Sequence, residues 1–532
     1  MHTAPPPLRL RIVAINDVYH LDHFPRFRSL VEHCRLVDPA DALLVTIAGD
    51  FVAPSLLSSL DGGRGMIACL NACGVTHASI GNHEDDIPAT ELRARISELS
   101  GVWLNTNMPA LGGKTRPYDV ITLQRGAASV RVGLVGILMD EPSAYLGVPF
   151  EGAEILAPEE TALSAAKRLR EVEGCAVVIP LTHQGIEADR ALAARRQEVP
   201  FPVILGGHDH TVFQEKIGDS WVLKAGAEAA RAFVIDVTFR DANPASKQSV
   251  EVEVRLEQVS LYPEDAAVRA LVDQQMEQVK QLHRATLRLI PAGESLSSVG
   301  TRARQTTMGT FLCGTLRDAL GADACFFNGG GIRGSKSYEG RFTYGDLVTE
   351  MPFDNEVVVV AMSGRALAAA IAYARKNAPA EAGRFLQVDS GLEVGPDHVL
   401  RSVRGAPLNL DGVYRVATVR ELFFGMDHIE PLMEFAAANP HALPSVGSGR
   451  EGKIVLIEAF ARELWKSLGG FGAVDIDGDG CVSEADLQSA LERVTGNASP
   501  LTAKLVFDVL DSNKDHRISS EEGSPLSRLR PR

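Results

Sequence analysis

Short apolar runs alternate with amphipathic stretches over the first 260 residues of the chain. Apolar runs of strand length cover residues 10–16, 42–49, 131–137, 176–182, 202–206 and 221–225. Stretches with the apolar spacing of a helix cover residues 24–36, 65–73, 158–173 and 187–196. Because strands that alternate with helices build layered α/β folds, this pattern predicts an α/β domain.

The pattern changes three times after this region. Residues 262–285 form a polar helical stretch, which we expect to bridge two domains. A second α/β region follows over 286–445, and prolines and glycines mark a joint after it. Residues 446–532 place two acidic loops between helical stretches, which predicts a small all-α domain. We therefore expect domains at 1–261, 286–445 and 446–532, with 262–285 as the connector.

Polar residues with metal-ligand chemistry follow four of these apolar runs and a shorter one, residues 78–81. They are Asp17, Asp50, Asn82 with His83, His183, and His208 with His210. Ligand sites in α/β folds form where the carboxyl ends of strands meet. Any one of these residues alone is more often an ordinary loop residue. The ordered set of carboxylate, amide and imidazole groups favours a dinuclear centre of divalent metal ions and a hydrolytic metalloenzyme.

Composition narrows the partners and the compartment. A net charge of −15 argues against nucleic acid or an anionic membrane as the main partner. The seven cysteines are scattered and form no Cys-x-x-Cys pair, which is typical of a reducing compartment. No signal-peptide core and no run of membrane-spanning length stands out, so we expect a cytoplasmic protein. The oligomeric state leaves no mark on the sequence.

The order Asp, Gly-Asp, Gly-Asn-His-Glu, His, Gly-His-x-His resembles the calcineurin-like metallophosphoesterases. Asp86, three residues after His83, resembles their 5′-nucleotidase branch. The resemblance implies a four-layer αββα domain with Asp17, Asp50 and His210 on one ion, and Asp50, Asn82, His183 and His208 on the other. Asp50 would bridge the two ions. His83, oriented by Asp86, would meet the charge of the transition state or leaving group.

One position departs from the family pattern. The family has His two residues after the first Asp, and this chain has Tyr19 there. Because a neutral phenol binds divalent ions poorly, we expect the first ion to be held more weakly. The sequence does not distinguish Mn, Zn, Mg or Fe.

The second α/β region carries a glycine-rich segment, Asn328-Gly-Gly-Gly-Ile-Arg333. In context it resembles the substrate domain of 5′-nucleotidases. The resemblance implies that Arg304 and Arg333 hold the anionic end of the substrate beside Asn328, that Phe353 stacks on a base, and that Asp427 accepts from a ribose hydroxyl. Glu421 replaces the second stacking aromatic, with Phe423 and Phe424 close by, so we expect shallow base discrimination. The alternative is that segment 328–333 is an ordinary glycine-rich turn, that Phe353 packs in the core, and that Asp427 stabilises a turn.

Two acidic segments near the end fit the twelve-residue calcium loop of an EF-hand. The first offers Asp475, Asp477, Asp479, the carbonyl of Cys481, and Asp486 at position twelve. The second offers Asp511, Asn513, Asp515, the carbonyl of Arg517, and Glu522. Gly480 occupies the turn position of the first loop, and His516 occupies it in the second. An acidic turn solvated by water is the alternative for each.

Together these features predict a phosphomonoesterase, a 5′-nucleotidase in the first place, with Ca²⁺-binding loops appended. Its reaction would be in-line attack on phosphorus by water activated between two divalent ions. A sugar-phosphate or cyclic-diester phosphohydrolase fits the same metal ligands. A calcium-binding scaffold with a degenerate phosphatase domain is the alternative of a different class, and Tyr19 is the residue that favours it.

Overall fold

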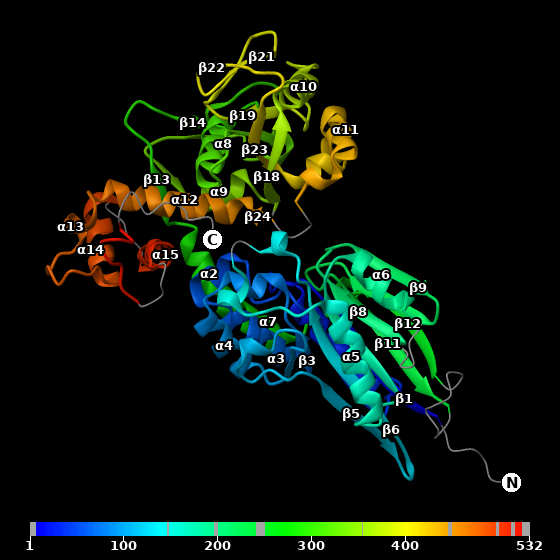
Figure 1. Ribbon diagram of the computed structural model, residues 1–532. Coiled ribbons are helices and arrows are strands. Elements are labelled where there is room, and N and C mark those ends of the chain that lie inside the picture. The colour runs from blue at the N-terminus through cyan, green and yellow to red at the C-terminus, as the bar shows by residue number, and fades with distance from the viewer. Residues whose placement is uncertain are drawn as a thin grey trace. The chain divides into compact units, whose positions relative to one another are not determined.

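The computed structural model describes residues 7–145, 148–195, 201–240, 250–353, 355–444, 449–495, 500–511 and 516–523. The chain divides into two compact units, Met1–Glu277 and Gln278–Arg532 (Figure 1). Among the described residues, no helix combines the length and apolar character needed to cross a bilayer. The cytoplasmic location stays a prediction.

The first unit is built on two six-stranded sheets. One has the order β12 (Val250–Gln258), β11 (Arg231–Phe239), β1 (Leu8–Ile15), β2 (Ala42–Ala48), β3 (His77–Ser79) and β4 (Val102–Leu104). In it, β1 to β4 are parallel, and β11 and β12 add antiparallel to the β1 edge. The other has the order β5 (Asp119–Arg125), β6 (Ala128–Leu138), β7 (Val177–His183), β8 (Val203–Gly207), β10 (Ser220–Ala225) and β9 (Val212–Ile217). In it, β6, β7, β8 and β10 are parallel.

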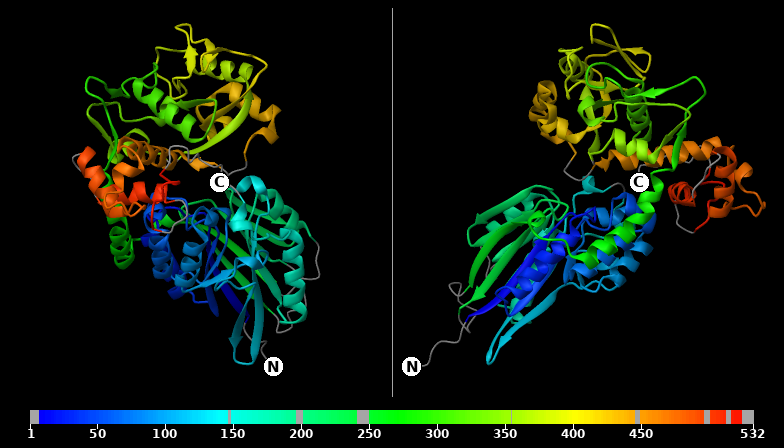
Figure 2. Two further views of the ribbon diagram at one scale, coloured as in Figure 1. Left: turned by 60° about the vertical axis from the view of Figure 1, so that its left-hand side comes forward. Right: turned by 180° about the vertical axis from the view of Figure 1, so that it is seen from behind.

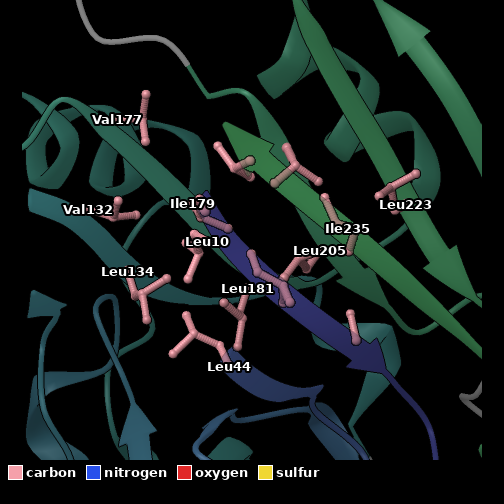
Figure 3. Packing of buried hydrophobic residues seen from close by; sticks show 14 of the residues in the cluster. Leu10, Leu44, Val132, Leu134, Val177, Ile179, Leu181, Leu205, Leu223 and Ile235 are labelled. Carbon is pink, nitrogen blue, oxygen red and sulfur yellow. The ribbon is translucent and has the colours of Figure 1, made fainter. Parts of the chain in front are cut away.

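The two sheets pack face to face through aliphatic side chains. Leu10 on β1 and Leu44 on β2 meet Leu134, Leu181 and Leu205 of the other sheet in one buried cluster (Figure 3). Burying these side chains is the main force that holds the sheets together, at about 1.5–3 kcal/mol for each fully buried residue. Figure 2 shows the packed sheets from two further directions.

Helices cover the outer faces and complete four layers. On the side of the first sheet, α1 (Phe24–Leu36) packs directly against β1 and β2, α3 (Arg64–Cys73) packs on α1, and α2 (Leu56–Asp61) and α4 (Ala89–Glu98) pack on α3. On the second sheet, α5 (Pro158–Glu171) and α6 (Ile186–Ala194) bury Ala162, Leu169 and Leu192 against β6, β7 and β8. The helix-sheet-sheet-helix arrangement is the predicted one.

A five-stranded sheet forms the centre of the second unit. Its order is β19 (Leu386–Val388), β15 (Ala324–Asn328), β23 (Val413–Val419), β18 (Glu356–Ser363) and β24 (Arg450–Glu451). The surrounding helices are α8 (Thr307–Ala319), α9 (Tyr344–Glu350), α10 (Gly364–Arg375) and α11 (Glu430–Ala438). Short strands form three small sheets: β13 (Thr286–Leu289) with β17 (Arg341–Thr343), β14 (Leu296–Ser297) with β16 (Ser337–Tyr338), and β20 (Leu392–Val394), β21 (Leu400–Val403) and β22 (Ala406–Pro407). Helix α7 (Ala266–Leu282) lies in the predicted connector and crosses the boundary between the units.

The C-terminal helices share a core with the end of α12 (Gly452–Ser467). Trp465 of α12 packs with residues of α13 (Phe471–Val474), α14 (Glu484–Thr495) and α15 (Pro500–Leu510). The start of this segment belongs elsewhere, since β24 pairs with β18, and Phe460 of α12 stacks on Phe311 of α8 with ring centroids 5.4 Å apart. Helix α12 therefore joins the helical segment to the second α/β core, which the sequence pattern did not indicate.

Candidate metal centre and substrate-binding residues

The candidate metal ligands stand where parallel strands end. Asp17 and Asp50 follow β1 and β2, and Asn82 opens the 3₁₀-helix η1 (Asn82–Asp86) after β3. His183 is the last residue of β7, and His208 follows β8 directly. Because the two sheets are packed face to face, residues far apart in sequence meet at one edge of both sheets.

The structure brings these residues into two groups that share one carboxylate. Ligand atoms of Asp50, His183 and His208 lie within 4.8 Å of one another, and so do those of Asp17, Asp50 and His210. His183 Nε2 is 3.0 Å from Asp50 Oδ2, and His210 Nε2 is 3.2 Å from Asp17 Oδ1. A carboxylate shared between two ligand groups is the arrangement that two neighbouring divalent ions need.

The backbone around the ligands is strained and closely packed. Asp50 and His208 have φ values of 54° and 84°, in the left-handed region that residues with a side chain seldom adopt. A Cβ atom at Gly81 would clash with Asp50 Oδ1, and one at Gly207 would lie 2.7 Å from His183 Nδ1. Glycine is therefore required at both positions for the ligand loops to approach.

The free polar atoms fit a bound cation. Among the described residues, the buried Asn82 Oδ1 and His208 Nδ1 have no hydrogen-bond partner, and the buried His183 Nε2 has only its 3.0 Å approach to Asp50 Oδ2. His183 Nδ1 bonds to Ala48 O at 2.8 Å, which leaves Nε2 as the ligand atom. Burial lowers the pKa of His208 to about 3, so this imidazole is neutral, the form that binds metal ions. The donor set of oxygen and imidazole nitrogen suits divalent metal ions.

Tyr19 lies inside the ligand group. Its hydroxyl is 3.0 Å from His210 Nε2 and donates to Asp50 Oδ2 at 3.3 Å. Burial, then the carboxylates of Asp50 and Asp17, raise the pKa of Tyr19 well above its usual value, so the side chain is a neutral phenol. The hydroxyl thus stands among the ligands of the first group, where the family has an imidazole.

His83 and Asp86 form a close pair beside Asp50. His83 Nδ1 is 2.7 Å from Asp86 Oδ2, and the backbone N–H of His83 donates to Asp50 Oδ1 at 2.9 Å. Burial by itself lowers the pKa of His83, but the carboxylates of Asp86 and Asp50 outweigh it and raise that pKa to about 10. The imidazolium therefore keeps its proton at neutral pH and presents a positive charge to the site.

Glu84 has a structural role that the sequence reasoning missed. Its buried carboxylate accepts from the N–H groups of Asp50, Phe51 and Val52 at 2.8 to 3.0 Å, and from Gly81 N–H at 2.6 Å. It therefore ties the loop of Asp50 to the loop of Asn82. The signal was present, because an acidic residue three positions after Gly81 can accept from the exposed N–H groups of a helix start.

In the second unit the predicted substrate residues form two pairs. Asn328 ends β15, and its Nδ2 donates to Asp427 Oδ2 at 2.6 Å. The Arg333 guanidinium lies over the Phe353 ring, 5.7 Å from the centroid, and both side chains are exposed. Arg304 is also exposed and donates to Val299 O at 3.1 and 3.3 Å.

An exposed aromatic stands near the position where Glu421 replaces the expected one. Phe423 is buried against Phe435, whereas 58% of Phe424 is exposed. The Arg420 guanidinium covers one face of the Phe424 ring at 4.4 Å. Phe424 is thus the exposed aromatic of this segment.

The first acidic loop folds around its carboxylates. Oxygens of Asp475, Asp477 and Asp479 lie within 4.8 Å of one another, and Asp475 accepts from Gly480 N–H at 3.2 Å. In the second loop, Asp511 accepts from His516 N–H at 3.0 Å in the same relative positions. Val482 and Ile518 exchange backbone hydrogen bonds at 2.9 and 3.1 Å and so join the loops. Asn513 and Asp515 lie outside the described residues.

Known families and proteins match this chain over most of its length. The calcineurin-like phosphoesterase family matches residues 10–212, and the 5′-nucleotidase C-terminal domain matches residues 285–433. Protein UshA of Yersinia enterocolitica is 23% identical over 455 residues, which are 75% of this chain and 81% of that protein. Trifunctional nucleotide phosphoesterase protein YfkN of Bacillus subtilis is 24% identical over 465 residues, and the chain spans 31% of its length.

A solved structure shows the same fold. The NAD nucleotidase NadN of Haemophilus influenzae superposes with a TM-score of 0.65 at 17% identity, covering 87% of this chain and 97% of that one. Fold and site together define a metallophosphoesterase domain followed by a second α/β domain. The chain carries a calcineurin-like phosphoesterase domain and a 5′-nucleotidase C-terminal domain, the two domains of hydrolases that act on phosphoric ester bonds.

Proposed function

We propose that the chain hydrolyses nucleoside 5′-phosphates at a dinuclear metal centre. The ligands would be Asp17, Asp50, Asn82, His183, His208 and His210. The observation that carries the proposal is the buried Asp50 carboxylate, which belongs to both ligand groups. The two ions, when bound, would lower the pKa of a water molecule and neutralise phosphoryl oxygens.

The chain's own residues would prepare the phosphate for attack. Asp86 holds His83 Nδ1 at 2.7 Å, so the imidazolium has its other N–H available for a phosphoryl or leaving-group oxygen. Because charge on those oxygens grows in the transition state, a fixed cation stabilises the transition state more than the substrate. We assign His83 to this role and Asp86 to its positioning.

We propose that Arg304, Arg333 and Asn328 bind the anionic part of a nucleotide, and that Asp427 accepts from a ribose hydroxyl. Phe353, 47% exposed, would stack on the base. Phe424 offers a second exposed ring, but Arg420 already covers one of its faces. The Arg333 guanidinium likewise lies over the Phe353 ring, so each ring has one face left for a base. Glu421 stands where the family has its second stacking aromatic, and this replacement supports shallow discrimination between bases.

The test is phosphate release by the purified full chain. AMP, other nucleoside 5′-phosphates, sugar phosphates, a cyclic nucleotide and an aryl phosphate are compared with Mn²⁺ or Zn²⁺ present. Asp50→Asn is the control, since it keeps the side-chain volume but removes the shared carboxylate charge. Nucleoside 5′-phosphates should be the best substrates. Faster release from sugar phosphates or the cyclic diester would transfer the proposal to those substrates.

Tyr19 favours a second candidate, a calcium-binding scaffold with a degenerate phosphatase domain. A neutral phenol in the ligand group weakens the first ion site. Equal phosphate release by the chain and by Asp50→Asn, over all substrates, would support the scaffold and reject the enzyme.

We also propose that the acidic loops bind Ca²⁺. The three clustered carboxylates of 475–479, the left-handed Gly480 at φ 85°, and the backbone pairing of Val482 with Ile518 support this assignment. Calorimetric titration with Ca²⁺ should show binding that Asp475→Asn weakens. Heat signals that do not differ between the two proteins would reject it.

A further inference from the structure

A buried lysine lies behind the histidine ligands of the first unit. Lys224 is the residue before last of β10, and its side chain is fully buried. Its ammonium donates to Gln184 O at 2.6 Å and to Gly207 O at 2.8 Å. It also forms ion pairs with Asp189, at 2.9 Å, and with Asp209.

The groups that Lys224 binds are the chain neighbours of three ligands. Gln184 follows His183, Gly207 precedes His208, and Asp209 stands between His208 and His210. A single ammonium with three N–H donors therefore fixes the ends of two different strands. Strand β10 brings it there, because β10 pairs in parallel with β8, Leu223 beside Leu205.

Asp189 extends the same network on the other side. Its Oδ1 accepts from Thr182 Oγ1 at 2.7 Å and from Gln184 Nε2 at 2.9 Å. The residues on both sides of His183 are thus held by one carboxylate. A Cβ atom at Gly206 would lie 2.7 Å from Asp189 Oδ2 and 2.8 Å from Lys224 Cε, so Asp189 and Lys224 occupy the space beside this glycine of β8.

The loop that carries His208 and His210 needs contacts from other elements to keep its conformation. His208 and His210 have φ values of 84° and 52°, a left-handed conformation that persists in residues with a side chain only where the surroundings enforce it. Lys224 bonds to the carbonyl before His208 and to the side chain between the two histidines. Without these bonds the loop can relax, and the imidazoles then leave the ligand geometry.

We propose that Lys224 and Asp189 are positioning residues that set the metal affinity of the centre, by holding His183, His208 and His210 in ligand geometry. This inference rests on the proposed function for the identity of the centre. It adds the residues, none of them a ligand, on which the affinity depends. Such supporting contacts typically change metal affinity by about 10–100-fold.

The experiment measures Mn²⁺ affinity of the full chain by competition with a chromogenic chelator, without substrate. Lys224→Met removes the ammonium. Lys224→Met also leaves the carboxylates of Asp189 and Asp209 without their ammonium, and their charge alone would attract Mn²⁺ more strongly. The double variant Lys224→Met/Asp189→Asn therefore serves as a charge-balanced partner. We expect both to bind Mn²⁺ about 10–100-fold more weakly.

The matched control is Arg11→Met/Asp236→Asn. Arg11 and Asp236 form a buried two-point ion pair, at 2.7 and 2.8 Å, between β1 and β11. Its loss should lower the melting temperature as much but leave Mn²⁺ affinity within about threefold. Circular dichroism checks that each variant folds. Where one does not, Asp209→Asn takes its place, because it removes a partner of Lys224 at a partly exposed side chain.

The outcomes separate this inference from the proposed function. Folded variants that bind Mn²⁺ as tightly as the parent would overturn the positioning role. The positioning role would also be overturned if Lys224→Met weakened Mn²⁺ binding no more than Arg11→Met/Asp236→Asn does. A parent that binds Mn²⁺ but releases no phosphate would end the phosphomonoesterase proposal and leave the positioning role standing. A parent that binds no Mn²⁺ would end both.

Discussion

Glu84→Gln gives a sharp test of how the site is held together. The Glu84 carboxylate accepts four backbone hydrogen bonds, two on each oxygen: Phe51 and Val52 on Oε1, Asp50 and Gly81 on Oε2. Glutamine has the same shape but only one acceptor oxygen. Two of the four N–H groups would therefore face the NH₂ group of the amide, with no acceptor.

The number of hydrogen bonds lost determines how much Glu84→Gln destabilises these loops. A hydrogen bond to a charged group contributes about 1.5–3 kcal/mol, so the loss of two costs about 3–6 kcal/mol. At about 1.4 kcal/mol per factor of ten, opening of these loops becomes at least about 100-fold more frequent. The energy is local, because all four donors lie in the loops that carry Asp50 and Asn82.

Hydrogen exchange followed by mass spectrometry measures this opening directly. Peptides that contain Asp50 to Val52 and Gly81 should lose protection by at least about 100-fold in Glu84→Gln. Glu350→Gln is the matched control, since this buried carboxylate accepts from Ser298, Tyr338 and Gly334 in the second unit. It should leave the Asp50 peptide unchanged. Protection of that peptide within about threefold of the parent in Glu84→Gln would refute the reasoning.

Three further predictions follow from single contacts. Asp86→Asn removes the carboxylate that holds the pKa of His83 near 10. Since His83 is protonated below its pKa and neutral above it, the alkaline limb of the kcat/KM profile should move at least about one pH unit lower. An unmoved limb would show that His83 is not the group that titrates there. Tyr19→His replaces a neutral phenol 3.0 Å from His210 by an imidazole. Mn²⁺ should therefore bind at least about tenfold more tightly in a calorimetric titration. An unchanged affinity would show that residue 19 does not reach the ion. Leu181→Ala opens a cavity between the two sheets and should lower the free energy of unfolding by about 2–5 kcal/mol. Calorimetry should show a lower melting temperature. An unchanged melting temperature would mean that the core collapses around the smaller side chain.

Local pattern determined the elements of this protein well. The apolar spacing of residues 24–36 predicts the observed α1 at both ends, and the run 42–49 differs from β2 by one residue. The kinds of candidate ligand were also readable, because Asp50 and His183 stand at strand ends in the chain itself. These features depend on neighbours a few residues away, and the sequence carries that information directly.

Distances between remote segments were decided only by the tertiary structure. His208 N–H donates to Asp17 across 191 positions, which depends on the order of strands in two sheets and on their packing. The run 221–225 indicates a strand, but only its place beside β8 turns Lys224 toward the loops of His183 and His208. Side-chain periodicity tells which face of a strand is buried; it does not tell which strand lies next to it, and the shape of this site depends on that choice.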